Sequence, residues 1–356
     1  MEGVFAFFLE SSFLYLLLFG EKRLSPRAHL GAAVLVFLGS WLSGWFIIVT
    51  NAWMQHPVGH AVQDDGKVML VSLSQYLTNP WAFWQYLHTM LGSVVTASFV
   101  VASVGAFYLL SGKHETHAKK LLSVAVPVGL AACVLVAFPA GDQQAKLVAA
   151  HQPVSFAAME GHFHTEDGAG LVLIGQPNME TLTLDNPIVL PRFLSFMTHQ
   201  RWDTRIEGLT SFDRSRWPDN VPLLYFAYHV MVGLGTIFIG LMSLSALQLF
   251  RKRLYQTRIL LWGLMLALPF PYIANTAGWL TAELGRQPWL IYDVMRTRDG
   301  YTLEVSSGNV LFTLLGYMGL YAVLSLLFFA LALRILRAGP APAAPKGTTA
   351  PAEAGE

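Results

Sequence analysis

Several ionisable side chains stand inside apolar stretches of this sequence, where a charge is costly and usually serves a function. Glu10 lies within the apolar run 7–13, and Glu2 precedes it by about two helical turns. Eight positions on a helix place the two carboxylates about 80° apart, on roughly the same side. Such a pair could relay protons or neutralise a buried cation or metal. Alternatively, Glu2 only marks the beginning of the helix.

Two further residues could together bind a haem iron. His88 and Met231 each stand near the beginning of an apolar run. Imidazole and thioether form a known axial pair for low-spin haem iron. Taken alone the pattern is weak, because a Met in an apolar helix is usually core filler and an isolated His usually packs with a hydrogen bond.

The segment 275–289 combines aromatic, acidic and basic residues. Trp279 and Glu283 are four residues apart and share a helix face, while Gly285 predicts the end of that helix and Pro288 prevents its continuation. Arg286 would then lie near the membrane surface, where its planar fork could bind a carboxylate or a haem propionate. The alternative is an aromatic belt with an Arg side chain that reaches for water.

The composition indicates the class of protein to which these residues belong. Hydrophobic residues make up 54% of the 356 positions and charged residues only 13%, against about 25% charged in soluble domains. The formal net charge of +1 gives no electrostatic footprint for nucleic acid. The single cysteine, Cys133, excludes an intrachain disulfide and a cysteine-based zinc or iron–sulfur site. The chain is therefore predicted to be an all-α, polytopic membrane protein.

About seven apolar runs are long enough to cross a bilayer, which takes about 20 residues. They lie at roughly 3–20, 29–50, 84–110, 120–139, 221–249, 257–281 and 308–333. The first has no basic beginning and no convincing cleavage site, so we interpret it as a span rather than a signal peptide.

Basic clusters follow the first, third, fifth and last runs, and therefore share one side, which should be the cytoplasm. The N-terminus is then expected outside and the C-terminus inside a bacterial cytoplasmic (inner) membrane. We divide the chain into spans (1–139), a long extracytoplasmic loop (140–220), further spans (221–338) and a disordered tail (339–356). Aromatic residues in the loop predict that it is ordered, whereas the tail is rich in Pro, Ala and Gly.

Several motifs together resemble subunit I of the cytochrome bd-type quinol oxidases. They are the stretches 2–11 (EGVFAFFLES), 51–55 (NAWMQ) and 285–289 (GRQPW), with the helices of His88 and Met231, in the order of the family. The family oxidises a membrane quinol and reduces dioxygen to water. The resemblance implies haem b (low-spin), haem b (high-spin) and either haem d or a further haem b as cofactors. It also implies a second polytopic subunit as partner, within membrane lipid.

The resemblance also implies roles for individual residues. His88 and Met231 match the axial ligands of the low-spin haem, and Glu283 matches the carboxylate of the dihaem centre, as an iron ligand. Trp279 and Arg286 match residues that support that centre. Two acids, Glu2 and Glu10, match its proton path and haem environment, and Glu160 matches the quinol-site acid of the outer loop.

Three departures from the family pattern stand out. The family has two further spans upstream, one with a histidine that ligates a dihaem iron. We therefore expect a truncated gene model, a fragment or a natural split in which another chain supplies those spans, and an incomplete oxygen site. Ser155 stands where many members have Lys, and His229 stands where an Arg commonly precedes the Met ligand. His229 could still contact a haem propionate.

Two other function classes compete with the oxidase. A membrane haem b electron-transfer protein without oxygen reduction would agree with the missing spans, although Glu283 and the run 285–289 oppose it. A cofactor-free transporter could use Glu10, His88 and Glu283 as a proton relay, but it has no need of the whole motif series.

Overall fold

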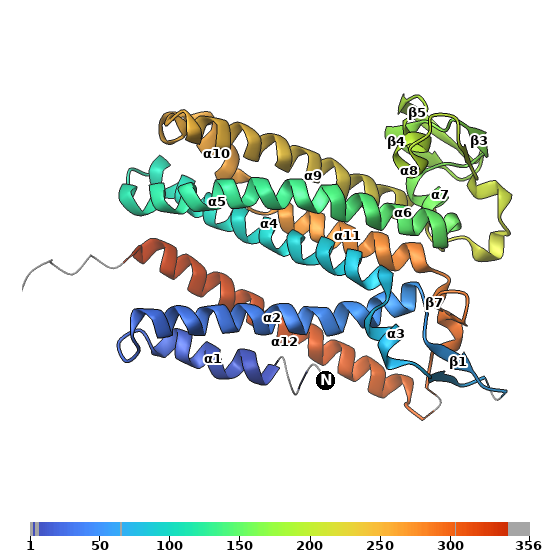
Figure 1. Cartoon of the computed structure of the whole chain (residues 1–356), viewed down its shortest axis with the longest axis horizontal. Coiled ribbons are helices and arrows are strands. Elements are labelled where there is room, and N and C mark those ends of the chain that lie inside the picture. The colour runs from blue at the N-terminus through green and yellow to red at the C-terminus, as the bar shows by residue number, and fades with distance from the viewer. Residues whose placement is uncertain (1–2, 4–6, 65, 303, 341–356) are drawn as a thin grey trace, which may run out of the picture.

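The computed structural model describes residues 3, 7–64, 66–302 and 304–340. Figure 1 shows long helices side by side, with the labelled strands gathered at one end of them. The helices are α1 (Phe7–Phe19), α2 (Pro26–Gln55), α3 (Leu73–Leu77), α4 (Pro80–Leu110), α5 (Glu115–Leu135), α6 (Asp142–His151), α7 (Pro153–Glu160), α8 (Phe193–His199), α9 (Val221–Phe250), α10 (Arg258–Leu266), α11 (Phe270–Arg286) and α12 (Ser307–Ala338). The strands form four antiparallel pairs: β1 (His60–Val62) with β2 (Val68–Leu70), β3 (Glu166–Asp167) with β6 (Arg205–Ile206), β4 (Leu171–Asn178) with β5 (Thr183–Leu190), and β7 (Trp289–Ile291) with β8 (Met295–Arg296).

Five helical segments of the described residues are long and apolar enough to cross a membrane. They are Pro26–Gln55, Leu73–Leu110, Glu115–His151, Val221–Phe250 and Ser307–Ala338. A sixth is the pair α10 and α11, which is bent by 42° at a short break, and α1 is a shorter apolar helix. The polytopic all-α fold is thus confirmed, while the expected count of about seven is not. The predicted span 257–281 is a broken pair of helices.

Polar caps and prolines place the beginnings of the spans. Ser25 accepts a hydrogen bond from the Ala28 backbone N–H, Asn79 accepts one from Trp81, and Asn220 accepts one from Leu223. A proline stands in the first turn of α2, α4 and α9, where no helical N–H partner is lost. Two spans consequently begin a few residues before the predicted positions 29 and 84.

A wide helical turn, η2 (Val136–Gly141), separates α5 from α6. Phe138 has extended backbone angles there and Pro139 supplies no N–H, so the regular ladder of helical hydrogen bonds is interrupted. The expected boundary at 139/140 between spans and outer loop falls in this turn. Its consequence for the site is that the Val136 carbonyl can accept a bond from outside the helix.

The apolar core lies among α4, α5, α9 and α10, around side chains such as Phe99, Leu122, Met242 and Leu264. A second core, which includes Phe156, Phe163 and Leu209, stabilises residues 140–220, named the outer segment after the side of the membrane predicted for it, and joins this segment to α9. The aromatic anchors therefore do order this segment. In contrast, α12 has no buried residue in the chain.

Candidate functional site

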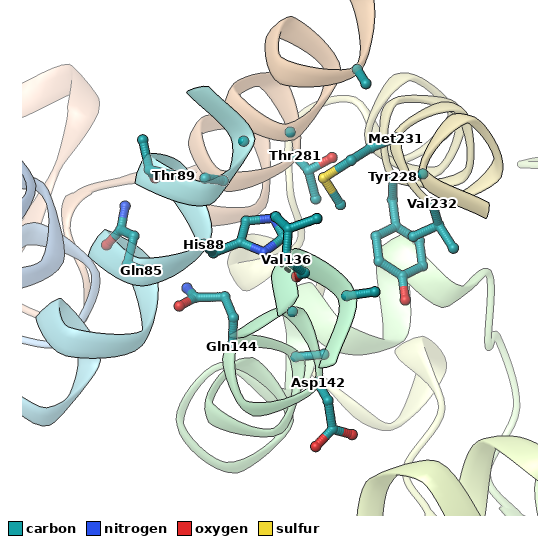
Figure 2. Close-up of a pocket in the computed structure, with 18 of the residues that line it drawn as sticks. Gln85, His88, Thr89, Val136, Asp142, Gln144, Tyr228, Met231, Val232 and Thr281 are labelled. Atoms are coloured by element: carbon teal, nitrogen blue, oxygen red, sulfur yellow. Dashed lines mark hydrogen bonds between the residues drawn. The ribbon is translucent and has the colours of Figure 1, made fainter. Parts of the chain in front are cut away.

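A cavity of about 390 Å³ lies where α4, η2, α6, α9 and α11 meet, and residues of α7 and α8 also line it. Figure 2 shows the His88 ring, from α4, and the Met231 sulfur, from α9, both pointing into this space. The two residues are separated by more than a hundred positions in the sequence, and the fold brings both to one cavity. Most of the other lining side chains are apolar or small.

The His88 ring is held in one orientation. Its Nδ1 lies 3.0 Å from the Val136 carbonyl oxygen, which the break in η2 leaves available. A carbonyl only accepts, so Nδ1 carries the proton and Nε2 keeps its lone pair. Gly141 lies against the ring, since a Cβ built there would be 3.4 Å from Cε1. The geometry presents Nε2 as a metal ligand.

Met231 packs against a glycine of α11. A Cβ built at Gly278 would lie 2.9 Å from the Met231 sulfur, closer than ordinary packing allows. The glycine therefore lets α11 approach the thioether closely. Trp279, the next residue, also lines this cavity, and its expected role beside the dihaem centre stays a prediction.

Glu283 lies on α11 but does not line this cavity. Its Oε1 accepts a hydrogen bond of 2.7 Å from the Asn51 side chain on α2, and its Oε2 forms an ion pair with Arg286. Arg286 is only 3% exposed and also donates to the Leu290 carbonyl, while its Nε has no partner among the described residues. A buried guanidinium N–H without a partner is costly, which suits a site for an acceptor group such as a propionate.

Glu160 is buried at the end of α7 and accepts a hydrogen bond from Tyr228, which lines the cavity. Burial raises the pKa of Glu160 from its ordinary 4.5 to about 7, while the Tyr228 bond acts in the opposite direction. Its Oε2 has no partner in the described part of the chain. Ser155, where a Lys was the family expectation, donates to the Gly285 carbonyl and lies on the cavity wall.

His229 bridges α9 and the outer segment. Its Nδ1 lies 2.9 Å from the Tyr225 carbonyl oxygen and its Nε2 lies 3.1 Å from that of Val172. The ring also stacks on Tyr225. Both nitrogens thus have protein partners, and the expected contact with a haem propionate stays a prediction.

Of the two acids at the beginning of the chain, Glu10 lies among the described residues. Glu10 accepts a hydrogen bond of 2.9 Å from Ser40, and α1 packs closely on α2 at Gly39. Glu2 lies outside the described residues. Among those residues, no three His, Cys, Asp or Glu side chains gather as they would to hold a metal ion.

Comparisons with known proteins show the family of the chain. A family model described as "Cytochrome bd terminal oxidase subunit I" matches residues 1–340. The chain belongs to this family. It is 30% identical to the cytochrome bd ubiquinol oxidase subunit 1 of Bacillus subtilis (strain 168), over 95% of this chain and 74% of the relative.

Two further relatives are similar along most of their length. The cytochrome bd-II ubiquinol oxidase subunit 1 of Escherichia coli (strain K12) is 27% identical, over 96% of this chain and 79% of the relative. The solved bd oxidase structure from Geobacillus thermodenitrificans superposes with a TM-score of 0.86 at 29% identity, over 96% of this chain and 77% of that one. The fold is therefore that of a bd oxidase, and a bacterial inner membrane is its location.

The residues of this bd-family chain fit a haem. The fixed His88 tautomer leaves Nε2 available as a ligand, the Met231 thioether lines the same cavity, and the glycines beside them leave space for a flat ring. Sequence reasoning missed the polar residues around them, namely Gln85, Asn51 and Tyr228. Only the motif at 51–55 contained a signal for one of these, since an Asn within an apolar run needs a hydrogen-bond partner.

Proposed function

We propose that this chain is the haem-bearing, quinol-oxidising subunit of a bd-type terminal oxidase. Its family makes it part of an oxidoreductase that acts on quinol with oxygen as acceptor. The observation that carries the haem assignment is the His88 ring, whose Nδ1 is bonded to Val136 while the ring enters the same cavity as Met231.

In this proposal His88 and Met231 would hold the low-spin haem b. When bound, this haem supplies one-electron transfer between the quinol and the oxygen-reducing site. The protein's own contribution is to fix the His88 tautomer through Val136 and to leave room beside Met231 through Gly278. Trp279 borders the same cavity, and we propose that it supports the dihaem centre with Arg286.

Glu160 acts as the acid–base group for quinol in this proposal. A carboxyl whose pKa lies at about 7 is ionised in part at neutral pH and can take a proton from a quinol hydroxyl. Tyr228 orients the carboxyl by a hydrogen bond and itself borders the cavity. The outer segment, 140–220, would then contribute the acid and α9 the cavity wall, so the proton leaves on the outer side.

Glu283 is proposed as an iron ligand of the high-spin haem b, with Arg286 as its partner cation and propionate donor. Both carboxylate oxygens have donors, Asn51 for Oε1 and Arg286 for Oε2, which hold the carboxylate in one orientation. Glu10, and Glu2 at the beginning of the chain, belong to the proton path to the oxygen site, whose third haem is haem d or a further haem b. The donation from Ser40 keeps Glu10 oriented within its apolar helix.

Assembly follows the family. Subunit I of a bd oxidase pairs with a second polytopic subunit, and we propose that this chain does the same. The proposed orientation places the N-terminus outside and the C-terminus in the cytoplasm, with the four divisions of the chain as predicted from the sequence.

The haem assignment can be tested at Met231. In the purified oxidase complex, Met231→Leu should abolish quinol-dependent oxygen uptake, because Leu fills similar volume but has no sulfur ligand. Met242→Leu is the matched control, since Met242 lies on the same helix in the apolar core and does not line the cavity. Normal uptake in Met231→Leu would overturn the ligand assignment.

A further inference from the structure

Three side chains form a hydrogen-bonded line from the haem cavity to Glu283. Gln85, on α4, lines the cavity and donates from Nε2 to Asn51 Oδ1 over 2.7 Å. Asn51, on α2, donates from Nδ2 to Glu283 Oε1 over 2.7 Å. The line crosses three helices, and its two ends are the walls of the His88/Met231 cavity and the carboxylate of α11.

The two bonds fix which way the Asn51 amide points. Its oxygen must face the Gln85 NH₂ group and its NH₂ group must face the Glu283 carboxylate. A flipped amide would place its NH₂ group against the Gln85 NH₂ group and its oxygen against the carboxylate, and neither pair can form a hydrogen bond. Asn51 is therefore a donor of fixed direction rather than a group that can turn away. A donor of this kind selects one orientation of the carboxylate it faces.

Glu283 depends on this donor for its orientation. Its side chain is 39% exposed in the chain, so packing leaves it considerable freedom. Its other partner, Arg286, lies one turn further on the same helix, so this ion pair does not orient the carboxylate toward α2. Among the described residues, Asn51 supplies the hydrogen bond to this carboxylate from a different helix.

The packing of α2 on α11 has a separate support. Gln55, one turn beyond Asn51, donates to the Ala282 backbone carbonyl over 3.0 Å. Gln152 in turn donates to both the backbone and the side-chain oxygen of Gln55. Gln55 thus holds α2 against α11 without contacting the Glu283 carboxylate. Its removal therefore tests the packing of the two helices while the hydrogen bond to Glu283 is kept.

We infer that Asn51 is a positioning residue that sets the orientation of the Glu283 carboxylate and, through Gln85, joins it to the wall of the His88/Met231 cavity. The inference rests on the proposed role of Glu283 at the high-spin haem. It predicts that the electronic state of that haem depends on a residue that is not itself an iron ligand.

The test measures the reduced-minus-oxidised spectrum and the midpoint potential of the high-spin haem in the purified complex. Asn51→Leu removes the donor, and Asn51→Asp keeps the shape of the side chain but places an acceptor against Glu283 Oε1. Both variants should shift the high-spin band and its midpoint potential. Because Asp has the shape of Asn, this variant decides the matter if the Leu variant fails to assemble.

Gln55→Leu is the matched control, since it removes an amide bond between the same two helices without touching the carboxylate. It should leave the high-spin band and potential as in the wild type. Equal shifts in Gln55→Leu and Asn51→Asp would overturn the inference, because loosened packing would then account for both. A wild-type high-spin signal in Asn51→Asp would also overturn it.

Glu283→Gln distinguishes this inference from the function on which it rests. An unchanged high-spin signal in Glu283→Gln would overturn the role of Glu283 and the inference with it. A changed signal in Glu283→Gln beside an unchanged one in Asn51→Asp would overturn the inference alone.

Discussion

Met231 and Gly278 show how closely the residues around the cavity are fitted to one another. The sulfur lies where a Cβ on Gly278 would come within 2.9 Å of it. In an ordinary helix a change from Gly to Ala gains about 0.5–1 kcal/mol of stability. At this position the methyl group instead displaces the proposed iron ligand.

Gly278→Ala should therefore weaken or shift the low-spin haem b band without removing a ligand residue. Absorbance of the reduced complex measures the band. Gly240→Ala on α9 is the control, because a Cβ built at Gly240 meets nothing within 4 Å. If both variants keep the wild-type band, Met231 is not an axial ligand in this geometry.

Glu160 makes a second prediction at the scale of single residues. Its pKa in the folded chain is raised to about 7, so between about pH 4.5 and 7 the folded state binds more protons than the unfolded state. The stability that the neutral form provides is complete below pH 4.5 and is lost as the pH rises through 7. The pKa change corresponds to about 3 kcal/mol.

Thermal unfolding of the purified complex at pH 5 and pH 8 measures this effect. Glu160→Gln should reduce the loss of stability toward pH 8, because the amide never ionises. Glu166→Gln, an exposed position on the same segment, should keep the wild-type dependence. An identical pH dependence in Glu160→Gln and wild type would contradict the burial of an ionising Glu160.

At the scale of elements, the outer segment is held together by a buried serine. Ser195 on α8 is fully buried, and its hydroxyl accepts from the Ala169 N–H over 2.8 Å and donates to the Thr204 carbonyl over 2.6 Å. These two residues lie just before β4 and β6. One side chain thus connects α8 with the beginnings of two strands.

Ser195→Ala should cost about 1–3 kcal/mol, the cost of leaving a buried backbone group without a partner. The expected result is faster proteolytic cleavage between residues 165 and 205 in the membrane-bound complex. Thr198→Ala is the control, because its hydroxyl only bonds the Leu194 carbonyl within the same helix. Equal cleavage rates in the two variants would contradict this account of the segment.

The elements were predictable to the extent that they depend on local sequence. Apolar runs and prolines predict the spans well, and Gly285 and Pro288 predict the end of α11 within one or two residues. The broken pair α10 and α11 was not predicted, because its two halves together read as one apolar run. The turn η2 was not predicted either. The sequence also does not show that the Val136 carbonyl in this turn is the hydrogen-bond partner of His88.

At the scale of the whole molecule, the site depends on contacts between distant parts of the chain. His88, Met231 and Glu283 were expected from motifs, but the bond between Asn51 and Glu283 joins positions 232 residues apart. No periodicity predicts such a pair, because it depends on how α2 lies on α11. The fold decides that Glu283 faces α2 while Trp279 faces the cavity, although both come from the same helix.

The exposure of α12 indicates what must surround this helix in the membrane. None of the residues of α12 is buried, so its apolar surface meets lipid or another polypeptide. Every labelled strand lies at one end of the long apolar helices (Figure 1).

The central claim is that His88 holds a low-spin haem b in this cavity, and one spectrum tests it most directly. The measurement is the reduced-minus-oxidised visible spectrum of the complex purified by a tag on this chain, for the wild type beside His88→Ala. A low-spin b band that is present in the wild type and absent from the variant is the predicted result. A band of equal height in both, or no haem in well-folded wild-type complex, would contradict the account.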